Sequence, residues 1–230
     1  MLTIAEETDR NYHRENIIGE QLVGEGFSEI MNNSLSKSSY YEETELNAYP
    51  WEETVKVMNP LSADLGVMRQ TLLFGGLESI VRNVNRKAQN LRFFEVGNVY
   101  KYNKEKWTEE SPVKAYVQDY HMALWVTGKR VQGSWAHPDE ESSFYELKAY
   151  VENVLRRIGI AQGLLVSEKS DNNVFDKAIA LRTRGGKVLV EMGILSHRLL
   201  KCFGLEQKVY YAELDWAGLM KAIRKNRLQF

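Results

Sequence analysis

The chain contains 230 residues, which fits one large domain or two small ones. Hydrophobic residues make up 43% of it and aromatic residues 11%, enough for a sizeable core, which excludes intrinsic disorder. Thirty basic residues against thirty-one acidic ones give a formal net charge of −1, unlike the basic balance of proteins that coat nucleic acid. The single cysteine, Cys202, excludes an internal disulfide and a thiolate metal cage.

Two features of the sequence concern its location in the cell. No run approaches the ~18 consecutive apolar residues of a membrane-spanning helix. The first ten residues are acidic and lack the basic-then-apolar pattern of a signal peptide. We therefore expect a cytoplasmic protein with no membrane association.

Glycine and proline divide the first half of the chain into helical and extended segments. A helix is expected from Asp9, its N-cap, to about Gly24. Its apolar positions are spread around the circumference, so it is buried either in the chain's own core or against a partner, and the pattern leaves both open. After it we expect a strand at 27–35, a short helix from Ser36 or Ser38 to Leu46, a strand at Thr54–Met58 ended by Asn59-Pro60, and a helix from Thr71 to about Lys87.

The second half is predicted to be richer in strands. Gly185-Gly186 lies between two alternating runs and is a strong signal for a hairpin turn. Gly97 in the middle of an extended run suggests a bulge or a close backbone approach. In order, we expect strands at 91–102 and 121–128 around a polar loop at 103–118, a helix at 143–158, strands at 177–184 and 187–195, a helix at 196–203, a strand at 208–215 and a helix at 216–226.

This order of elements predicts the fold class. Hairpin connections require antiparallel neighbours, and the strict strand–helix repeat of a parallel doubly wound sheet is absent. We therefore expect an α+β protein with an antiparallel sheet of about six strands covered by helices. Without an internal repeat or a long linker, residues 1–230 are expected to form a single domain.

The residues alone reveal little chemistry. The histidines, His13, His121, His137 and His197, are far apart, so surface or half-buried imidazoles are favoured over a zinc site. Cys202 lies among apolar residues and is expected to be a small buried hydrophobe. The four positive charges within Lys221–Arg227 could contact RNA phosphates or complement the carbonyl end of a helix.

Several short stretches together carry a family signature. They are Gln21–Glu29 with Asn33–Ser36, Asn59–Ser62 with Met68–Leu73, Asn83–Arg86 with Arg92–Tyr100, and Tyr211–Asp215. Their order and spacing resemble the catalytic-like module of the phenylalanyl-tRNA synthetase β subunit, from about Asn11 to Leu219. The resemblance implies a class II aminoacyl-tRNA synthetase core, an antiparallel six-stranded sheet flanked by helices.

The resemblance also implies that the class II motifs have lost their chemistry. The motif 3 arginine that contacts ATP has no counterpart in 210–220, and acidic residues cannot replace its planar guanidinium. The usual motif 2 arginine aligns with Lys101, and the pair Arg92 and Glu95 is spaced one residue too far apart. We therefore expect no catalytic residue and no metal site in this chain. The vestigial motif positions are Arg69, Glu95, Lys101, Glu213 and Asp215.

The implied role is assembly. In the family, the first helix and the strand after it form the motif 1 interface of an (αβ)2 heterotetramer. Carried onto this chain, the helix at about 9–25 would pack against partner subunits through Tyr12, Ile17, Ile18, Gln21 and Leu22. The expected function is a non-catalytic assembly module that supports ATP-dependent aminoacylation of tRNA(Phe) by the α subunit. Mg and ATP are expected only in the complete holoenzyme, and contact of this module with tRNA stays open.

Two alternatives belong to other functional classes. The chain could be an active class II ligase with unusual motifs, which ATP–pyrophosphate exchange by the isolated chain would reveal. It could also be a free-standing regulatory paralogue that senses an amino acid in its vestigial cleft. Specific thermal stabilisation by an amino acid would support that reading.

Overall fold

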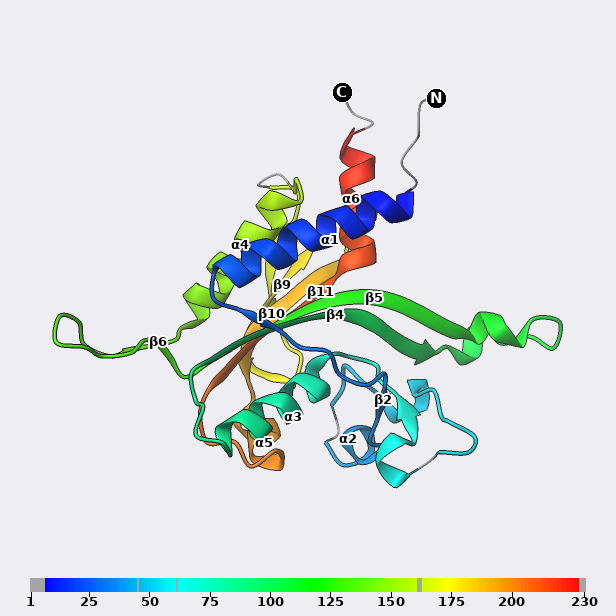
Figure 1. The fold of residues 1–230 in the computed structure, drawn as a ribbon. Helices are drawn as coiled ribbons and strands as arrows, with labels where there is room; N and C mark the ends of the chain where they lie inside the picture. Colours follow the sequence, from blue (N-terminus) through cyan, green and yellow to red (C-terminus); the bar gives the residue numbers. More distant parts are fainter. Residues whose placement is uncertain (1–6, 45, 61, 161–162, 228–230) are drawn as a thin grey trace.

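The computed structural model describes residues 7–44, 46–60, 62–160 and 163–227. Its centre is a seven-stranded sheet in the order β1-β4-β5-β11-β10-β9-β8 (Figure 1). In that order the strands are Ser28–Glu29, Leu91–Tyr102, Tyr116–Thr127, Val209–Asp215, Val188–Leu195, Phe175–Arg182 and Val166–Ser170. All pairs from β4 to β8 are antiparallel, which confirms the predicted α+β class, and the short β1 adds a parallel edge.

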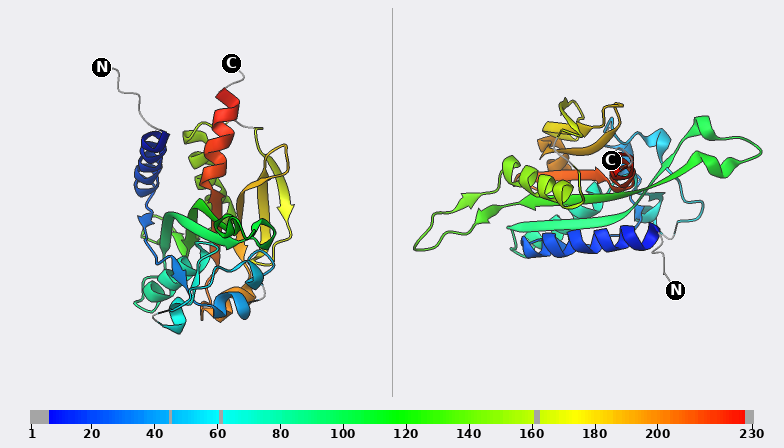
Figure 2. Two further views of the ribbon diagram at one scale, coloured as in Figure 1. Left: turned by 90° about the vertical axis from the view of Figure 1, so that its right-hand side faces the viewer. Right: turned by 90° about the horizontal axis from the view of Figure 1, so that it is seen from above.

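Three helices cover one face of the sheet, as Figures 1 and 2 show. They are α1 (Glu7–Gly24), α4 (Phe144–Arg157) and α6 (Trp216–Arg227). Their buried side chains form one apolar cluster with alternate strand residues such as Phe94, Met122 and Leu214. Because strand side chains alternate between faces, the even-numbered positions of β4, β5 and β11 all lie on the face covered by α1, α4 and α6.

The opposite face packs against α3 (Leu73–Val84), α5 (His197–Cys202), α2 (Ser39–Glu42) and the loops around them. The predicted apolar stripe of the 71–87 helix is confirmed, since Leu73, Leu77 and Ile80 are fully buried. Gly76 lets α3 approach closely, because a Cβ there would lie 2.1 Å from the Trp125 ring. This face contains the odd-numbered positions of β4, β5 and β11.

Two hairpin arms project from opposite sides of the body (Figures 1 and 2). One is the end of the long β4–β5 ribbon, closed by 3₁₀ turns at Lys104–Lys106 (η3) and Pro112–Ala115 (η4). The other contains β6 (Lys129–Val131) and β7 (Glu140–Glu141), which pair antiparallel. No helix among the described residues is long and apolar enough to cross a membrane.

The segment before α3 differs from the sequence prediction. In place of one strand at 27–35 there are β1 and the two-residue β2 (Leu35–Ser36), which pairs with β3 (Val67–Met68). The strand at Thr54–Met58 is wrong: 3₁₀ turns form at Trp51–Glu53 (η1) and Ala63–Leu65 (η2), and only Lys56 makes an isolated bridge. Local side-chain hydrogen bonds, such as Asn33 Oδ1 accepting from the Leu35 amide at 2.9 Å, compete here with strand pairing.

Three further differences concern the main sheet. The loop predicted at 103–118 is shorter, because β5 begins at Tyr116 and pairs with β4 along its whole length. Gly97 makes no bulge in that pairing, but the predicted alternative, a close approach, is confirmed: a Cβ at Gly97 would lie 2.3 Å from Arg69 Nη2. The edge strand β8 was not predicted because its exposed, charged sequence lacks an apolar alternation.

Candidate functional site

Arg92 and Glu95, the pair on β4 that resembles motif 2, point to opposite faces of the sheet. Arg92 points to the face covered by α1, α4 and α6, where its Nη2 donates to Glu146 Oε1 on α4 at 3.1 Å. Glu95 is an odd number of residues away and therefore lies on the α3 face. The two side chains cannot act on one ligand, so the strand period itself separates the pair that resembled motif 2.

On the α3 face, Glu95 is held by an arginine of the chain itself. Arg69 Nη1 lies 2.5 Å from Glu95 Oε1, and both side chains are almost fully buried. Arg69 Nε donates to the Asn98 carbonyl at 2.8 Å, and Asn32 Nδ2 donates to Glu95 Oε2 at 2.6 Å. The missing side chain of Gly97 makes room for the guanidinium. This arrangement fastens the segment before α3 to the sheet.

Glu213 on β11 is the centre of a second buried polar cluster. Its Oε2 accepts hydrogen bonds from the Thr71 and Tyr211 hydroxyls at 2.6 Å each, and from Tyr49 at 3.3 Å. Its Oε1 lies 2.8 Å from His121 Nδ1 and 3.4 Å from the Leu72 amide nitrogen. Both carboxylate oxygens are therefore occupied by groups of the same chain.

His121 and Glu213 each favour the charged form of the other. Burial by itself would raise the pKa of Glu213, but the hydrogen bond and charge of His121 outweigh it, and the pKa falls to about 2. Burial likewise opposes charging of His121, yet the hydrogen bond and charge of Glu213 raise the pKa of the imidazole. Near pH 6 the cluster is a buried imidazolium–carboxylate pair.

The remaining two positions lie at the margins of this face. Lys101 forms an ion pair with Glu53 at 3.6 Å, and both side chains are partly exposed. Asp215 accepts from the Gly218 amide at 2.7 Å, at the start of α6, and from Lys187 Nζ at 2.6 Å. Asp215 therefore satisfies an unpaired amide at a helix N-terminus, a structural role for a short acidic side chain.

The chemical capacity of this arrangement is limited. Adenylation requires cations placed around a triphosphate, with Mg²⁺ between its oxygens. Here Arg69 already forms an ion pair with Glu95, with 2.5 Å between Nη1 and Oε1, and residues 210–220 contain no arginine. In the described part of the chain, no three His, Cys, Asp or Glu residues are grouped to hold a metal.

The five interface candidates on α1 do not share one surface. Tyr12 is 65% exposed, and Ile17 and Gln21 are partly exposed. Ile18 and Leu22 are 0% exposed and belong to the core beneath the sheet-facing side of α1. Ile18 and Leu22 therefore hold the helix on its own domain and cannot contact a partner, whereas Val23, which was not a candidate, is 57% exposed.

Sequence reasoning missed the partners of the carboxylates and misplaced the cysteine. His121, Thr71 and Asn32 lie far in the sequence from the carboxylates that they contact. The one available signal was the alternation along β5, which places His121 on the same face as the buried Ala123 and Trp125. Cys202, expected to be buried, is exposed because it lies at the end of α5 on its outer side.

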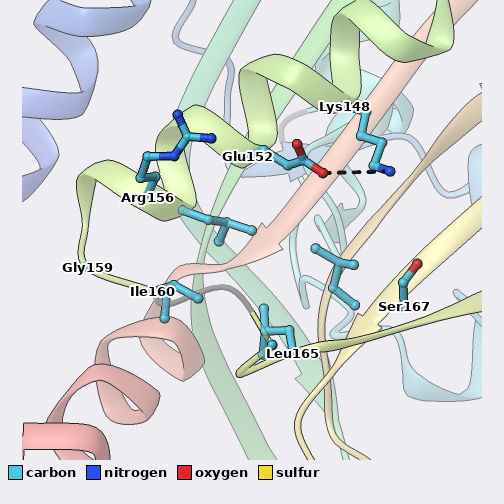
Figure 3. Close-up of a pocket in the computed structure, with 10 residues that line it drawn as sticks. Lys148, Glu152, Arg156, Gly159, Ile160, Leu165 and Ser167 are labelled. Carbon is cyan, nitrogen blue, oxygen red and sulfur yellow. Dashed lines mark ion pairs between the residues drawn. The ribbon is translucent and has the colours of Figure 1, made fainter.

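A pocket lies away from these clusters, between the end of α4 and strands β8 and β9 (Figure 3). It has a volume of about 710 Å³ and an apolar floor that includes Leu155, Ile160 and Leu181. At its rim Lys148 Nζ and Glu152 Oε1 form an ion pair at 3.7 Å. None of the five motif positions lines this pocket.

Comparisons with known proteins agree with this architecture. Residues 2–216 match the family model described as phenylalanyl tRNA synthetase beta chain CLM domain. The chain is 50% identical over 229 residues to the phenylalanine–tRNA ligase beta subunit of Bacteroides thetaiotaomicron, covering all of this chain and 28% of that protein. It is 47% identical to the Porphyromonas gingivalis beta subunit, covering 97% of this chain and 27% of that one.

A solved structure shows the same fold at low sequence identity. The pyrrolysyl-tRNA synthetase of Desulfitobacterium hafniense aligns with a TM-score of 0.65 and 14% identity, covering 94% of this chain and 70% of that one. This likeness shows the synthetase-like fold alone. The chain spans about 28% of the length of the Bacteroides relatives that it matches.

Proposed function

Because the chain belongs to the family of phenylalanyl-tRNA synthetase beta chain CLM domains, we propose that it is a non-catalytic assembly module of a phenylalanine–tRNA ligase. In this role it binds the α subunit in the cytoplasm, within an (αβ)2 heterotetramer, and supports the ATP-dependent charging of tRNA(Phe) that α performs. The relatives compared above are beta subunits of that ligase.

The observation that supports the non-catalytic role is that the polar side chains of the α3 face are bonded to one another. Glu213 accepts from Thr71, Tyr211 and His121 within 2.8 Å, and Arg69 is committed to Glu95. A nucleotide would have to break a buried ion pair to recruit this guanidinium, at a cost of about 3–5 kcal/mol. The free energy that the buried ion pair gives to the folded chain therefore opposes nucleotide binding by Arg69, and with it catalysis by this chain alone.

The outer side of α1 supports the assembly part. Tyr12 and Val23 leave an aromatic and an aliphatic side chain more than half exposed near opposite ends of one helix. Aromatic and apolar anchors of this kind are typical of the central part of protein interfaces. We assign the α-subunit contact to this outer side, with Ile18 and Leu22 fixing the helix from beneath.

The test is binding of the α subunit by the Val23→Asp variant. We expect at least tenfold weaker binding than wild type, measured by isothermal titration calorimetry, because a carboxylate would be desolvated in an apolar contact. Val166→Asp is the matched control, since Val166 is 46% exposed on β8 at the other edge of the sheet. Equal affinity of Val23→Asp and wild type would contradict the proposed interface.

A further inference from the structure

The arm formed by β6 and β7 carries an exposed aromatic side chain at its end. Trp135 is 100% exposed, so no described residue shields its ring from water. The residues around it, from Gln132 to Pro138, are exposed as well. A large indole entirely in water is unfavourable for an isolated domain, and such residues are enriched where proteins bind one another.

Bonds within the arm hold it in a defined shape. Lys129 Nζ lies 2.6 Å from Asp139 Oδ2, and the Gly133 amide donates to the other oxygen of Asp139 at 2.5 Å. At the tip, the Ser134 amide donates to the His137 carbonyl at 2.8 Å, which closes a turn around Trp135. The indole is therefore presented on an ordered turn, which lowers the entropy lost when it is buried.

The charges of the arm favour a protein over RNA as its target. Between 129 and 141 there are two cations against three carboxylates. Both cations are already paired, Lys129 with Asp139 and Arg130 with Glu140 at 2.5 Å. Binding to phosphates depends on free cations, which this arm lacks. Its indole instead fits an apolar pocket of another polypeptide.

The base of the arm is joined to the end of α1. Arg92 Nη2 donates to the Arg130 carbonyl at 3.1 Å, and Nη1 of the same guanidinium lies 3.1 Å from the position that a Cβ on Gly26 would occupy. Gly26 lies two residues after the end of α1, so the Arg92 side chain lies between this end of the helix and the base of the arm. In Figures 1 and 2 the arm continues outward beyond the C-terminal end of α1.

We propose that this arm is a second contact for the α subunit, and that Trp135 inserts into an apolar pocket of α while α lies along the outer side of α1. The inference rests on the proposed function. The inference adds Trp135 as an anchor residue on the β6–β7 arm, next to the α1 surface. The motif positions do not indicate this contact.

The test compares two exposed tryptophans on the two arms. Trp135→Ala is expected to weaken binding of the α subunit about tenfold or more, and Trp135→Phe, which keeps a ring, to weaken it less. Trp107→Ala on the β4–β5 arm is the control and should bind α as wild type does. The melting temperature of Trp135→Ala should equal that of wild type, because the ring contacts nothing in the isolated chain.

Fluorescence provides an independent readout. The emission of wild type minus that of Trp135→Phe isolates the indole at 135, and it should shift to shorter wavelength when α is added. Wild-type affinity of Trp135→Ala, or an unshifted difference spectrum, would overturn the proposal. Loss of tRNA binding with unchanged α binding would also overturn it, in favour of RNA.

The two proposals fail in different ways. If wild type does not bind α at all, the proposed function is wrong and this inference falls with it. If Val23→Asp weakens binding and Trp135→Ala does not, the α1 interface stands and only the arm contact is overturned. Equal weakening by Trp107→Ala would overturn the assignment to this arm.

Discussion

The two faces of the sheet are stabilised in different ways. The face beneath α1, α4 and α6 is mainly a continuous apolar cluster, to which Met122, Leu124 and Leu214 contribute, and its ion pair between Arg92 and Glu146 joins β4 to α4. The face beneath α3 combines apolar residues with two buried carboxylates, Glu95 and Glu213, each paired with a cationic side chain. Neighbouring residues of one strand, such as Glu213 and Leu214, therefore experience opposite environments.

This difference separates the apolar packing that holds the helices on the sheet from buried charges that the packing does not require. An apolar face is sufficient to hold helices on a sheet, and a buried ion pair is seldom more stabilising than apolar residues of the same shape. The charges on the α3 face lie at positions that resemble class II motifs, and each is satisfied inside the chain. In this chain the Arg69–Glu95 pair and the hydrogen bond from Asn32 to Glu95 fasten the segment before α3 to the sheet.

The largest effect is expected on the α3 face, for Glu213→Ala. Removing the carboxylate leaves the His121 imidazole and the Thr71 and Tyr211 hydroxyls without their shared acceptor. Breaking a buried pair in this way should lower the free energy of unfolding by about 3–5 kcal/mol, measured by urea denaturation. A loss below about 1 kcal/mol would show that the cluster does not stabilise the fold.

Leu214→Ala tests the other face at the adjacent position. Leu214 is fully buried beneath the helices, so the substitution should cost about 2–5 kcal/mol through lost burial and a cavity. Unlike Glu213→Ala, this loss should change little with pH, because the described buried residues that cluster with Leu214 are hydrophobic. A pH-dependent loss would contradict the separation of the two faces.

The smallest expected effect is a dependence of stability on pH. The pKa of His121 is raised in the folded protein, so its contribution is fully present below the unfolded value near 6.5 and is lost as the pH rises through the folded value. The free energy of unfolding of wild type minus that of His121→Gln should therefore be larger at pH 6 than at pH 9. A change of about 1.4 kcal/mol corresponds to a pKa difference of one between the folded and unfolded states.

The same variant pair should differ at low pH for another reason. The pKa of Glu213, about 2, is below its unfolded value of 4.5, so the stabilisation it gives is present above pH 4.5 and disappears as the pH falls towards 2. If wild type and His121→Gln follow parallel curves from pH 3 to pH 9, the imidazole and the carboxylate are not coupled.

The sequence predicted the elements whose signals are local. The stripe of Leu73, Leu77 and Ile80 specified α3, and Gly185-Gly186 specified the turn between β9 and β10, where Gly186 has a φ of 84°. It did not predict the region of 27–68, because Asn32 and its neighbours bond to Glu95 on a distant strand. Such tertiary bonds leave no periodic trace in the sequence.

The site was predictable in part. The resemblance named Arg69, Glu95 and Glu213, and the structure places all three on one face. It did not reveal that they are engaged by one another and by His121, because pairing across strands depends on register. The same limit explains the interface: the pattern of α1 could not decide which of Ile18 and Val23 faces the core.

The most direct test of the account is ATP–pyrophosphate exchange by the isolated chain with phenylalanine and Mg²⁺. With the Arg69 guanidinium bonded to Glu95 and no arginine in 210–220, we expect no exchange above the rate without protein. Saturable, phenylalanine-dependent exchange that Arg69→Met abolishes would contradict the account, because it would show that the α3 face still grips a nucleotide.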